Sequence, residues 1–233
     1  MCVPLAALVP AVLLAAPPQA SAATAPSGLW NFSVASGSNK VPDIDGSAQN
    51  LTLKGEWSTG LGYVNFNNAP SYGTTSTANF SPGDLEFAFG AVIRTTKVAP
   101  GTNPNVIQGG LGNDAAQFKI ALQPVSGGTA VCVLKGTKAN LLFKSSVTGL
   151  ANGGWHEIVC SRQATSVSIS VDGRVNSYAL SPGTIKLATG RQLLVAGKGS
   201  TTTYADQVIG SFGCAGMLTG PGALTALGAK MPC

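Results

Sequence analysis

The stretch from Val167 to Gly173 constrains the fold of this chain more than any other. Val167, Ile169 and Val171 alternate with serines, so the period of two predicts a strand with apolar side chains inward and hydroxyl groups toward solvent. The alternating serines are Ser166, Ser168 and Ser170. Asp172-Gly173 then predicts a tight turn, because Gly adopts positive φ without steric cost and Asp tolerates it. Residues 153–160 predict an antiparallel partner strand, and such a hairpin is typical of a β sandwich.

The composition agrees with an all-β fold. Apolar residues make up 44% of the 233 residues and charged residues 10%, and the 30 glycines suit short strands joined by many turns. A sandwich of this length is commonly one domain, and neither an internal repeat nor a linker divides the chain. We therefore expect a single core and no helix longer than one turn.

Apolar segments separated by turn residues predict ten strands. Loops rich in Gly, Ser, Thr and Pro lie between them, notably at 70–77, 99–104 and 199–203. The predicted strands cover residues 29–32, 62–66, 85–94, 105–108, 117–122, 129–134, 141–144, 155–162, 167–171 and 193–196.

Met1 to Ala22 has the features of a secretory signal peptide. An apolar run from Leu5 to Ala16 precedes the small-residue site Ala20-Ser21-Ala22, after which we expect cleavage. The basic residues usual before such a run are missing, since the first Lys or Arg is Lys40. The alternative is a membrane anchor, but prolines interrupt the run and it falls short of the roughly 20 apolar residues that a span requires. We expect a secreted protein without a membrane span, with residues 23–28 as a short leader and 29–233 as the folded domain.

Loss of the signal peptide would leave four cysteines, an even number in an oxidising compartment. Four thiols allow three pairings. We favour Cys132 with Cys160, since neighbouring antiparallel strands would bring them together, and Cys214 with Cys233, which would tether the last residue. The rival interpretation is a metal site, but no Cys-x-x-Cys motif occurs and the single histidine is His156.

The net charge of +5 and the isoelectric point near 9.0 fit either an anionic partner or an ordinary solvated surface. An acidic polysaccharide, a cell-wall polymer and nucleic acid are the anionic candidates. The 14 basic residues are scattered singly from Lys40 to Lys230, without the clustering and aromatic interleaving of nucleic-acid platforms. The pattern favours a solvated surface and predicts no nucleic-acid partner.

A series of short motifs extends along nearly all of residues 29–233. In order and spacing they resemble a laminin G-like domain of the concanavalin A-like class, in the form found in secreted actinobacterial proteins. The resemblance implies an all-β, two-sheet antiparallel jelly-roll sandwich, a fold that hosts sugar-binding modules, protein-binding modules and glycan-cleaving enzymes. The motifs are Leu29-Trp30-Asn31-Phe32, residues 41–50, 62–66, 85–94 and 105–110, Gly154-Trp155-His156 and Val171-Asp172-Gly173.

Related domains often hold calcium where an early Asp loop meets the last strands, so the resemblance also implies a calcium site. Its candidate ligands are Asp43, Asp45, Asn50 and Asp206, because Ca²⁺ gathers carboxylate and carbonyl oxygens. The closing strand departs from the family pattern, since Gly213 stands where an acid is expected. Asx turns are the alternative role for Asp43 and Asp45.

Candidate catalytic groups are few. A glycan-cleaving enzyme needs two facing carboxylates, and Asp84 and Glu86 form the one close pair on a predicted strand. The third acid of the alternating acidic strand in jelly-roll glucanases is missing, because position 88 is Ala. Exposed acids are common at strand ends, which explains Asp84 and Glu86 without catalysis. His156 alternates in step with Cys160, which favours a structural imidazole over a general base. We therefore predict no catalytic residue.

Trp155 has the opposite parity, so it either plugs one end of the sandwich or offers a face for sugar stacking. The function predicted is a secreted, non-catalytic recognition domain that binds glycan or cell-surface polymer through loops at the rim. Two alternatives remain: a glycoside hydrolase or polysaccharide lyase of the same fold, and a structural or adhesive protein that binds another protein. Polar and aromatic candidates for contact, none distinguishable from ordinary surface, are Tyr63, Tyr72, Tyr204 and Asn67-Asn68.

Overall fold

The computed structural model describes residues 27–34, 37–75, 80–99, 101–199, 206–231 and 233. In this part of the chain nearly all regular structure is β. The elements in chain order are β1 (Gly28–Asn31), β2 (Lys40–Val41), β3 (Leu51–Gly60), β4 (Tyr63–Thr75), β5 (Phe87–Arg94), β6 (Asn105–Gly109), β7 (Gln117–Gln123), the short 3-10 helix η1 (Val125–Gly127), β8 (Thr129–Lys135), β9 (Asn140–Thr148), β10 (Trp155–Arg162), β11 (Val167–Val171), β12 (Arg174–Tyr178), β13 (Leu193–Val195), β14 (Gly210–Thr219) and α1 (Ala223–Lys230).

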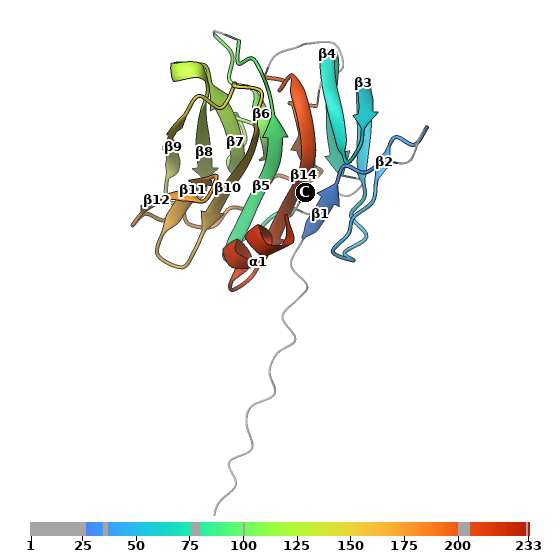
Figure 1. The fold of residues 1–233 in the computed structure, drawn as a ribbon. Helices are drawn as coiled ribbons and strands as arrows, with labels where there is room; N and C mark the ends of the chain where they lie inside the picture. The colour runs from blue at the N-terminus through green and yellow to red at the C-terminus, as the bar shows by residue number, and fades with distance from the viewer. Residues whose placement is uncertain (1–26, 35–36, 76–79, 100, 200–205, 232) are drawn as a thin grey trace, which may run out of the picture.

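The strands form two packed layers that share one long strand (Figure 1). They pair antiparallel in the order β12-β11-β10-β5-β14-β4-β13-β6-β7-β8-β9. β10, β5 and β14 lie in the front layer of Figure 1, and β7, β8 and β9 lie behind them. β4 belongs to both layers, because Val64 to Phe66 pair with β14 whereas Gly73 and Thr74 pair with β13. The predicted all-β jelly-roll sandwich is confirmed.

Aromatic rings fill the space between the layers. Phe87 and Phe89 occupy alternate inward positions on β5, and Phe118 of β7 packs against both, with ring centroids 5.6 and 4.8 Å away. Trp30 is also fully buried, and its indole N–H donates to the carbonyl oxygen of Gln49 at 2.7 Å. Burial of these rings is the main contribution to stability, and the indole hydrogen bond removes the cost of burying a polar group.

The predicted hairpin is confirmed, with one correction. β10 pairs with β11, and Asp172 (φ 50°) and Gly173 (φ 76°) form the two-residue turn into β12. The prediction that the serines of β11 face solvent is wrong for Ser168, which is only 6% exposed. Its hydroxyl group lies 2.8 Å from that of Ser161 on β10, and this hydrogen bond lets both hydroxyls be buried.

Several elements escape prediction from the sequence. β2, β3, β12 and β14 are absent from the predicted strands, and β4 continues to Thr75 through a segment predicted to be a loop. β14 is central in the sheet although it carries three glycines, which weaken a strand signal. α1 contradicts the expectation of no helix longer than a turn. It starts after Gly222 without a side-chain cap, so the usual signal of a helix start is missing.

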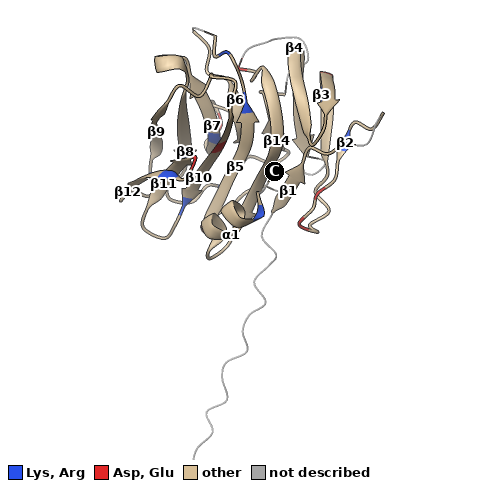
Figure 2. Cartoon of the chain, viewed as in Figure 1, with Lys and Arg blue, Asp and Glu red and all other residues tan. Residues whose placement is uncertain are grey.

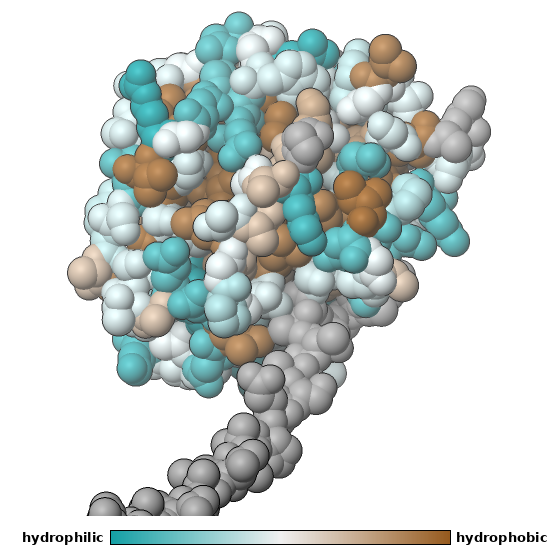
Figure 3. All heavy atoms as spheres, turned by 60° about the horizontal axis from the view of Figure 1, so that its bottom comes forward, coloured by the Kyte–Doolittle hydropathy of each residue, from teal (hydrophilic) through white to brown (hydrophobic). Residues whose placement is uncertain are grey.

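α1 covers part of the outer face of the front layer (Figure 1). Leu227 is fully buried there in a second apolar cluster, outside the main core. A Cβ atom at Gly216 would lie 2.7 Å from Leu29 and 3.1 Å from Leu227, so glycine at this position permits the close approach of the helix. Figure 3 shows hydrophobic and hydrophilic residues interspersed at this end of the molecule.

Two disulfides join the four cysteines in the pairing that the sequence favours. Cys132 on β8 and Cys160 on β10 have Cα atoms 6.1 Å apart and are both fully buried. The reason given from the sequence is wrong, however, because these strands are not neighbours and the bond links the two layers.

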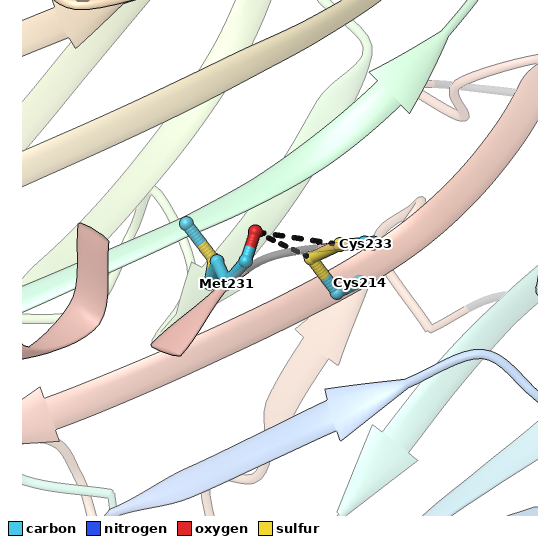
Figure 4. Close-up of a disulfide and its surroundings, with 3 residues drawn as sticks. All are labelled: Cys214, Met231 and Cys233. Carbon is cyan, nitrogen blue, oxygen red and sulfur yellow. Dashed lines mark hydrogen bonds between the residues drawn. A yellow bond between two sulfur atoms is a disulfide. The ribbon is translucent and has the colours of Figure 1, made fainter. Parts of the chain in front are cut away.

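The second disulfide attaches Cys233 to Cys214 on the outer face of β14 (Figure 4). Both sulfur atoms lie 3.6–3.7 Å from the carbonyl oxygen of Met231. Disulfide sulfur carries no hydrogen, so these are packing contacts. The bond holds the last residue against the sheet.

The two end strands of the order, β9 and β12, face each other across the open side of the sandwich. The Ser146 backbone N–H donates to Asn176 Oδ1 at 2.8 Å, and the rings of Phe143 and Tyr178 are 5.4 Å apart. Side-chain contacts rather than strand pairing therefore close this side.

The predicted signal peptide, residues 1–22, and the leader up to residue 26 lie outside the described residues, so both stay predictions. Within the described part of the chain, no helix has the length and apolar character needed to cross a membrane.

Candidate functional site

Three side chains form a ridge on the part of the front layer's outer face that α1 leaves open. The ridge consists of Tyr63 on β4, Arg94 on β5 and Trp155 on β10. The rings of Tyr63 and Trp155 meet edge to face, with centroids 5.9 Å apart. The guanidinium carbon of Arg94 lies 5.2 Å from the Tyr63 ring centre and 4.9 Å from that of Trp155. These cation–π contacts fix the three side chains relative to one another.

Strand register brings the ridge together. Trp155 begins β10 and pairs directly with Arg94, the last residue of β5. Their neighbours Ile93 and Ile158 point into the core, so Trp155 and Arg94 must point outward. Tyr63 enters at the start of β4, directly after the turn of Leu61 and Gly62, where Gly62 has φ 75°.

A hollow of about 430 Å³ lies on one side of the ridge, and we call it the tryptophan hollow. Its wall includes the polar side chains of Asn31 and Ser33. Gly213 forms part of its surface, and a Cβ atom there would lie 3.3 Å from Cys233 and 3.6 Å from Trp155. The glycine at position 213 thus leaves room beside the indole ring.

A second hollow of about 490 Å³, the arginine hollow, lies on the other side of the ridge. Asn65, Arg94 and Ser211 line it. Arg94 Nη2 donates to Ser211 Oγ over a long 3.4 Å, and Ser211 Oγ donates to Asn65 Oδ1 at 2.9 Å. The hollow therefore presents the remaining guanidinium N–H groups and the Asn65 amide N–H groups as donors.

Exposed apolar side chains border both hollows. Leu61 at the hairpin tip is fully exposed and Trp155 is 41% exposed beside the tryptophan hollow, while Ile209 lies at the arginine hollow. Apolar groups next to amides and a cation make a surface suited to ligands with both carbon-bound hydrogens and oxygens.

Trp155 does not plug the sandwich, and this alternative from the sequence is wrong. Of the other contact candidates, Asn67 lines the arginine hollow and Tyr72 lines a separate hollow of about 190 Å³. Tyr204 and the side chain of Asn68 lie outside the described part of the structure. The structure thus brings Tyr63, Trp155 and Asn67 to one surface and leaves Tyr72 elsewhere.

Asp84 and Glu86 line a hollow of about 220 Å³ at another place on the molecule. Asp84 accepts a hydrogen bond from the Thr184 hydroxyl at 2.5 Å, and Glu86 accepts one from the Ala164 N–H at 3.1 Å. Arg162 also lines this hollow. The two carboxylates fasten neighbouring loops, a structural role that accounts for both.

His156 holds two loops together, in agreement with its structural interpretation. Its Nδ1 lies 2.7 Å from Asp172 Oδ2 in the β11–β12 turn, and its Nε2 lies 3.1 Å from Asn152 Oδ1. Both ring nitrogens are engaged, which leaves none free to act on a ligand. Burial raises the pKa of the nearby Glu157 carboxyl group, and Asp172 acts in the same direction.

The candidate calcium ligands have other partners. Asp43 accepts hydrogen bonds from the N–H groups of Leu29 at 3.0 Å and Gln49 at 3.0 Å, and from the Asp45 N–H and the Ser47 hydroxyl. The contact with the Asp45 N–H is an Asx turn, the alternative to a metal, and the other three tie the loop to Leu29, Ser47 and Gln49.

The other ligand candidates lie in similar arrangements. Asp45 accepts from the Ser47 N–H at 2.9 Å, and Asn50 Oδ1 accepts from the Asp43 N–H at 3.1 Å. Asp206 forms an ion pair with Lys198. Among the described residues, no three His, Cys, Asp or Glu side chains gather as a metal-binding group. The calcium site stays a prediction.

We expect Asp43→Asn to lower the free energy of unfolding by about 1–3 kcal/mol at pH 7, because Asn cannot accept all four hydrogen bonds. Burial raises the pKa of Asp43, but the hydrogen bonds outweigh burial and hold it below 3.8. The ionised Asp43 therefore stabilises the fold at pH values above its unfolded-state pKa, and this stabilisation is lost as the pH falls through its folded-state pKa. Urea unfolding at pH 7 and pH 3 should show the difference from wild type shrinking in acid. Asp45→Asn is the control, because the remaining side-chain oxygen can still accept the single Ser47 N–H contact, and an equal loss in both variants would contradict the prediction.

Arg94, Leu61 and Gly213 are site residues that sequence reasoning missed. Arg94 is the last residue of a strongly apolar predicted strand, at a position whose side chain alternates away from the core. This position could have marked Arg94 as a surface residue of the sheet. Its partner Trp155 is 61 residues away, so only the strand register reveals the pair. Figure 2 shows the basic residues scattered over several strands, so charge alone does not single out Arg94.

No protein-family model matches this chain, and no curated protein matches it. Solved structures do share its fold. A structure of botulinum neurotoxin type C, whose cell entry is described as dependent on two ganglioside molecules, aligns over 89% of this chain and 52% of its own, with 13% identity and a TM-score of 0.58. Trypanosoma rangeli sialidase with 2,3-difluorosialic acid aligns over 82% of this chain and 30% of its own, with 12% identity and a TM-score of 0.57.

Domains LG4-5 of the mouse laminin α1 chain align over 57% of this chain and 35% of their own, with 17% identity, but the TM-score of 0.44 is too low to support an argument. The chain spans about a third of the sialidase and about half of the neurotoxin chain. At these identities the likeness concerns the fold alone. This chain is a two-layer jelly-roll β sandwich of the kind found within those larger proteins.

Proposed function

We propose that this chain is a secreted, non-catalytic recognition domain of the laminin G-like type, which binds glycan or cell-surface polymer. The observation that carries the proposal is the aromatic ridge of Tyr63, Arg94 and Trp155 between two open hollows. Aromatic rings pack against the C–H faces of sugars, and the neighbouring amides can bond the hydroxyl groups. The site proposed here is the outer sheet face rather than the rim loops.

Two further observations support the proposal. The disulfides suit an oxidising compartment and agree with the predicted signal peptide. Structures with this fold are described in complex with sialic acid or as depending on gangliosides. Those descriptions belong to larger proteins of low identity, so they make sugar a reasonable class of ligand to test first.

A glycan-cleaving enzyme is the rival function, and Asp84 and Glu86 are the pair that the sequence offers for it. Both carboxylates accept hydrogen bonds from neighbouring loops. An acid and a base would have to be free to reach the glycosidic oxygen and a water or sugar carbon. Release of reducing ends by the wild type, abolished in Asp84→Asn or Glu86→Gln, would overturn the non-catalytic assignment.

We expect Trp155→Ala to weaken glycan binding at least tenfold, because it removes the exposed ring that a sugar would stack on. The measurement is a glycan array of the secreted protein, followed by titration of the best ligand. Tyr72→Ala, an aromatic truncation in a separate hollow, is the matched control and should bind like wild type.

Three outcomes would correct the proposal. Loss of binding in Tyr72→Ala but not in Trp155→Ala would move the site to the other hollow. Binding abolished by a calcium chelator would show that the site depends on a metal. Silence across the whole array would favour a protein partner and contradict glycan recognition.

A further inference from the structure

Arg94 is a cation with no anionic partner among the described residues. Among the described residues its guanidinium group makes two ring contacts and one long hydrogen bond to Ser211, and none of the ion pairs involves it. The other arginines with clear contacts differ, since Arg191 pairs with Asp114 and Arg162 donates to three carbonyl oxygens. Arg94 therefore retains most of its five N–H donors for a ligand.

The surroundings of Arg94 add donors rather than acceptors. Ser211 Oγ donates its hydrogen to Asn65 Oδ1, which leaves the amide N–H groups of Asn65 free toward the arginine hollow. Glu157 is an acidic residue on the same sheet face, where it pairs with Val92. Glu157 does not line the arginine hollow, and of the described residues that do, Arg94 is the one with a charged side chain.

We propose that this surface selects anionic glycans, with the sugar ring on Trp155 and its carboxylate or sulfate group on Arg94. The proposal rests on the proposed function and deepens it by naming the ligand class. A guanidinium group held in place by two aromatic rings offers its N–H groups as a planar fork, the geometry that matches two oxygens of one anion. The two hollows on either side of the ridge leave space for the sugar units that precede and follow the charged one.

Matched polymers that differ only in charge test this inference. Polygalacturonate is compared with its methyl ester for the carboxylate arm, and dextran sulfate is compared with dextran for the sulfate arm. We expect at least tenfold tighter binding of the charged member of one pair, with the preference decreasing as salt is raised. The arm that shows the preference identifies the anionic group.

Three variants assign the effect to Arg94. Arg94→Gln should lose the preference for the charged polymer, and Arg94→Lys should retain part of it, because Lys keeps the charge without the fork. Arg174→Gln makes the same charge change at an exposed position on β12 and should behave like wild type. Melting temperatures of all variants must match that of wild type, so that binding and folding effects are separated.

The outcomes separate this inference from the function on which it rests. Equal binding of charged and neutral polymers, still lost in Trp155→Ala, would overturn anion selection and leave glycan recognition intact. A preference that survives in Arg94→Gln, or is lost equally in Arg174→Gln, would overturn the role of Arg94. No binding to either pair, together with a silent glycan array, would overturn both.

Discussion

The double variant Cys132→Ala/Cys160→Ala should lose roughly 3–4 kcal/mol of unfolding free energy from the disulfide alone, and more from the cavity that it leaves. A disulfide lowers the entropy of the unfolded chain by closing a loop, and this effect grows with the logarithm of the loop length. Here the two cysteines are 28 residues apart. Both cysteines are fully buried in the main core, so truncation also removes packing contacts between the layers. For a domain of this size the melting temperature should fall by roughly 10 °C.

The second disulfide provides the control. Cys214→Ala/Cys233→Ala opens a loop of 19 residues, for which the entropic cost is nearly the same, about 3 kcal/mol. Cys233 is exposed, however, so little cavity cost is added. Urea unfolding monitored by fluorescence should rank the core variant as the less stable. Equal losses in both variants would show that burial of the Cys132–Cys160 bond contributes nothing beyond its loop.

Arg162→Met should be the most damaging single substitution, with an expected loss of about 3–5 kcal/mol. The Arg162 side chain donates to the carbonyl oxygens of Gly83 at 3.0 Å, Gly183 at 2.9 Å and Leu85, and it lies 5.0 Å from the ring centre of Phe87. The residue is only 5% exposed, so Met would fill the space but leave three carbonyl groups without their donor. Burial lowers the pKa of the guanidinium group, and nearby acids oppose that effect.

Thermal melting followed by circular dichroism measures this effect. Arg162→Lys should lie between wild type and Arg162→Met, because Lys keeps the charge but cannot reach all three carbonyl groups. Arg174→Met, an exposed arginine on β12, should change stability by less than about 0.5 kcal/mol. For a domain of this size, a loss of 1 kcal/mol lowers the melting temperature by roughly 2–4 °C. A melting temperature of Arg162→Met within about 2 °C of wild type would therefore show that the hydrogen bonds of Arg162 do not stabilise the fold.

Local patterns were sufficient to predict much of the fold. The alternation in β11, the Asp172-Gly173 turn and the long apolar run of β5 are properties of adjacent residues, and the structure confirms these elements. β14 could not be predicted in this way, because its glycines are needed for close approach of α1 and Cys233. Those contacts come from distant segments, which a local pattern does not contain.

The candidate site was predictable only in part. The alternation of residues along the predicted strand placed Trp155 on the face opposite to Cys160. The ridge, however, depends on the pairing of Trp155 with Arg94 and on the position of Tyr63. These residues come from three strands far apart in sequence. The contact of Asp43 with the Asp45 N–H was easier to anticipate, because an Asx turn involves residues only two positions apart.

The contact between β9 and β12 covers part of the edge of β9. A strand at the end of a sheet presents unpaired N–H and C=O groups, which can recruit another chain and start aggregation. Here the Ser146 N–H is already taken by Asn176, and the Lys144 carbonyl oxygen accepts from the Tyr178 hydroxyl at 3.4 Å. Side chains of β12 therefore occupy two backbone groups of β9 that another strand would otherwise pair with.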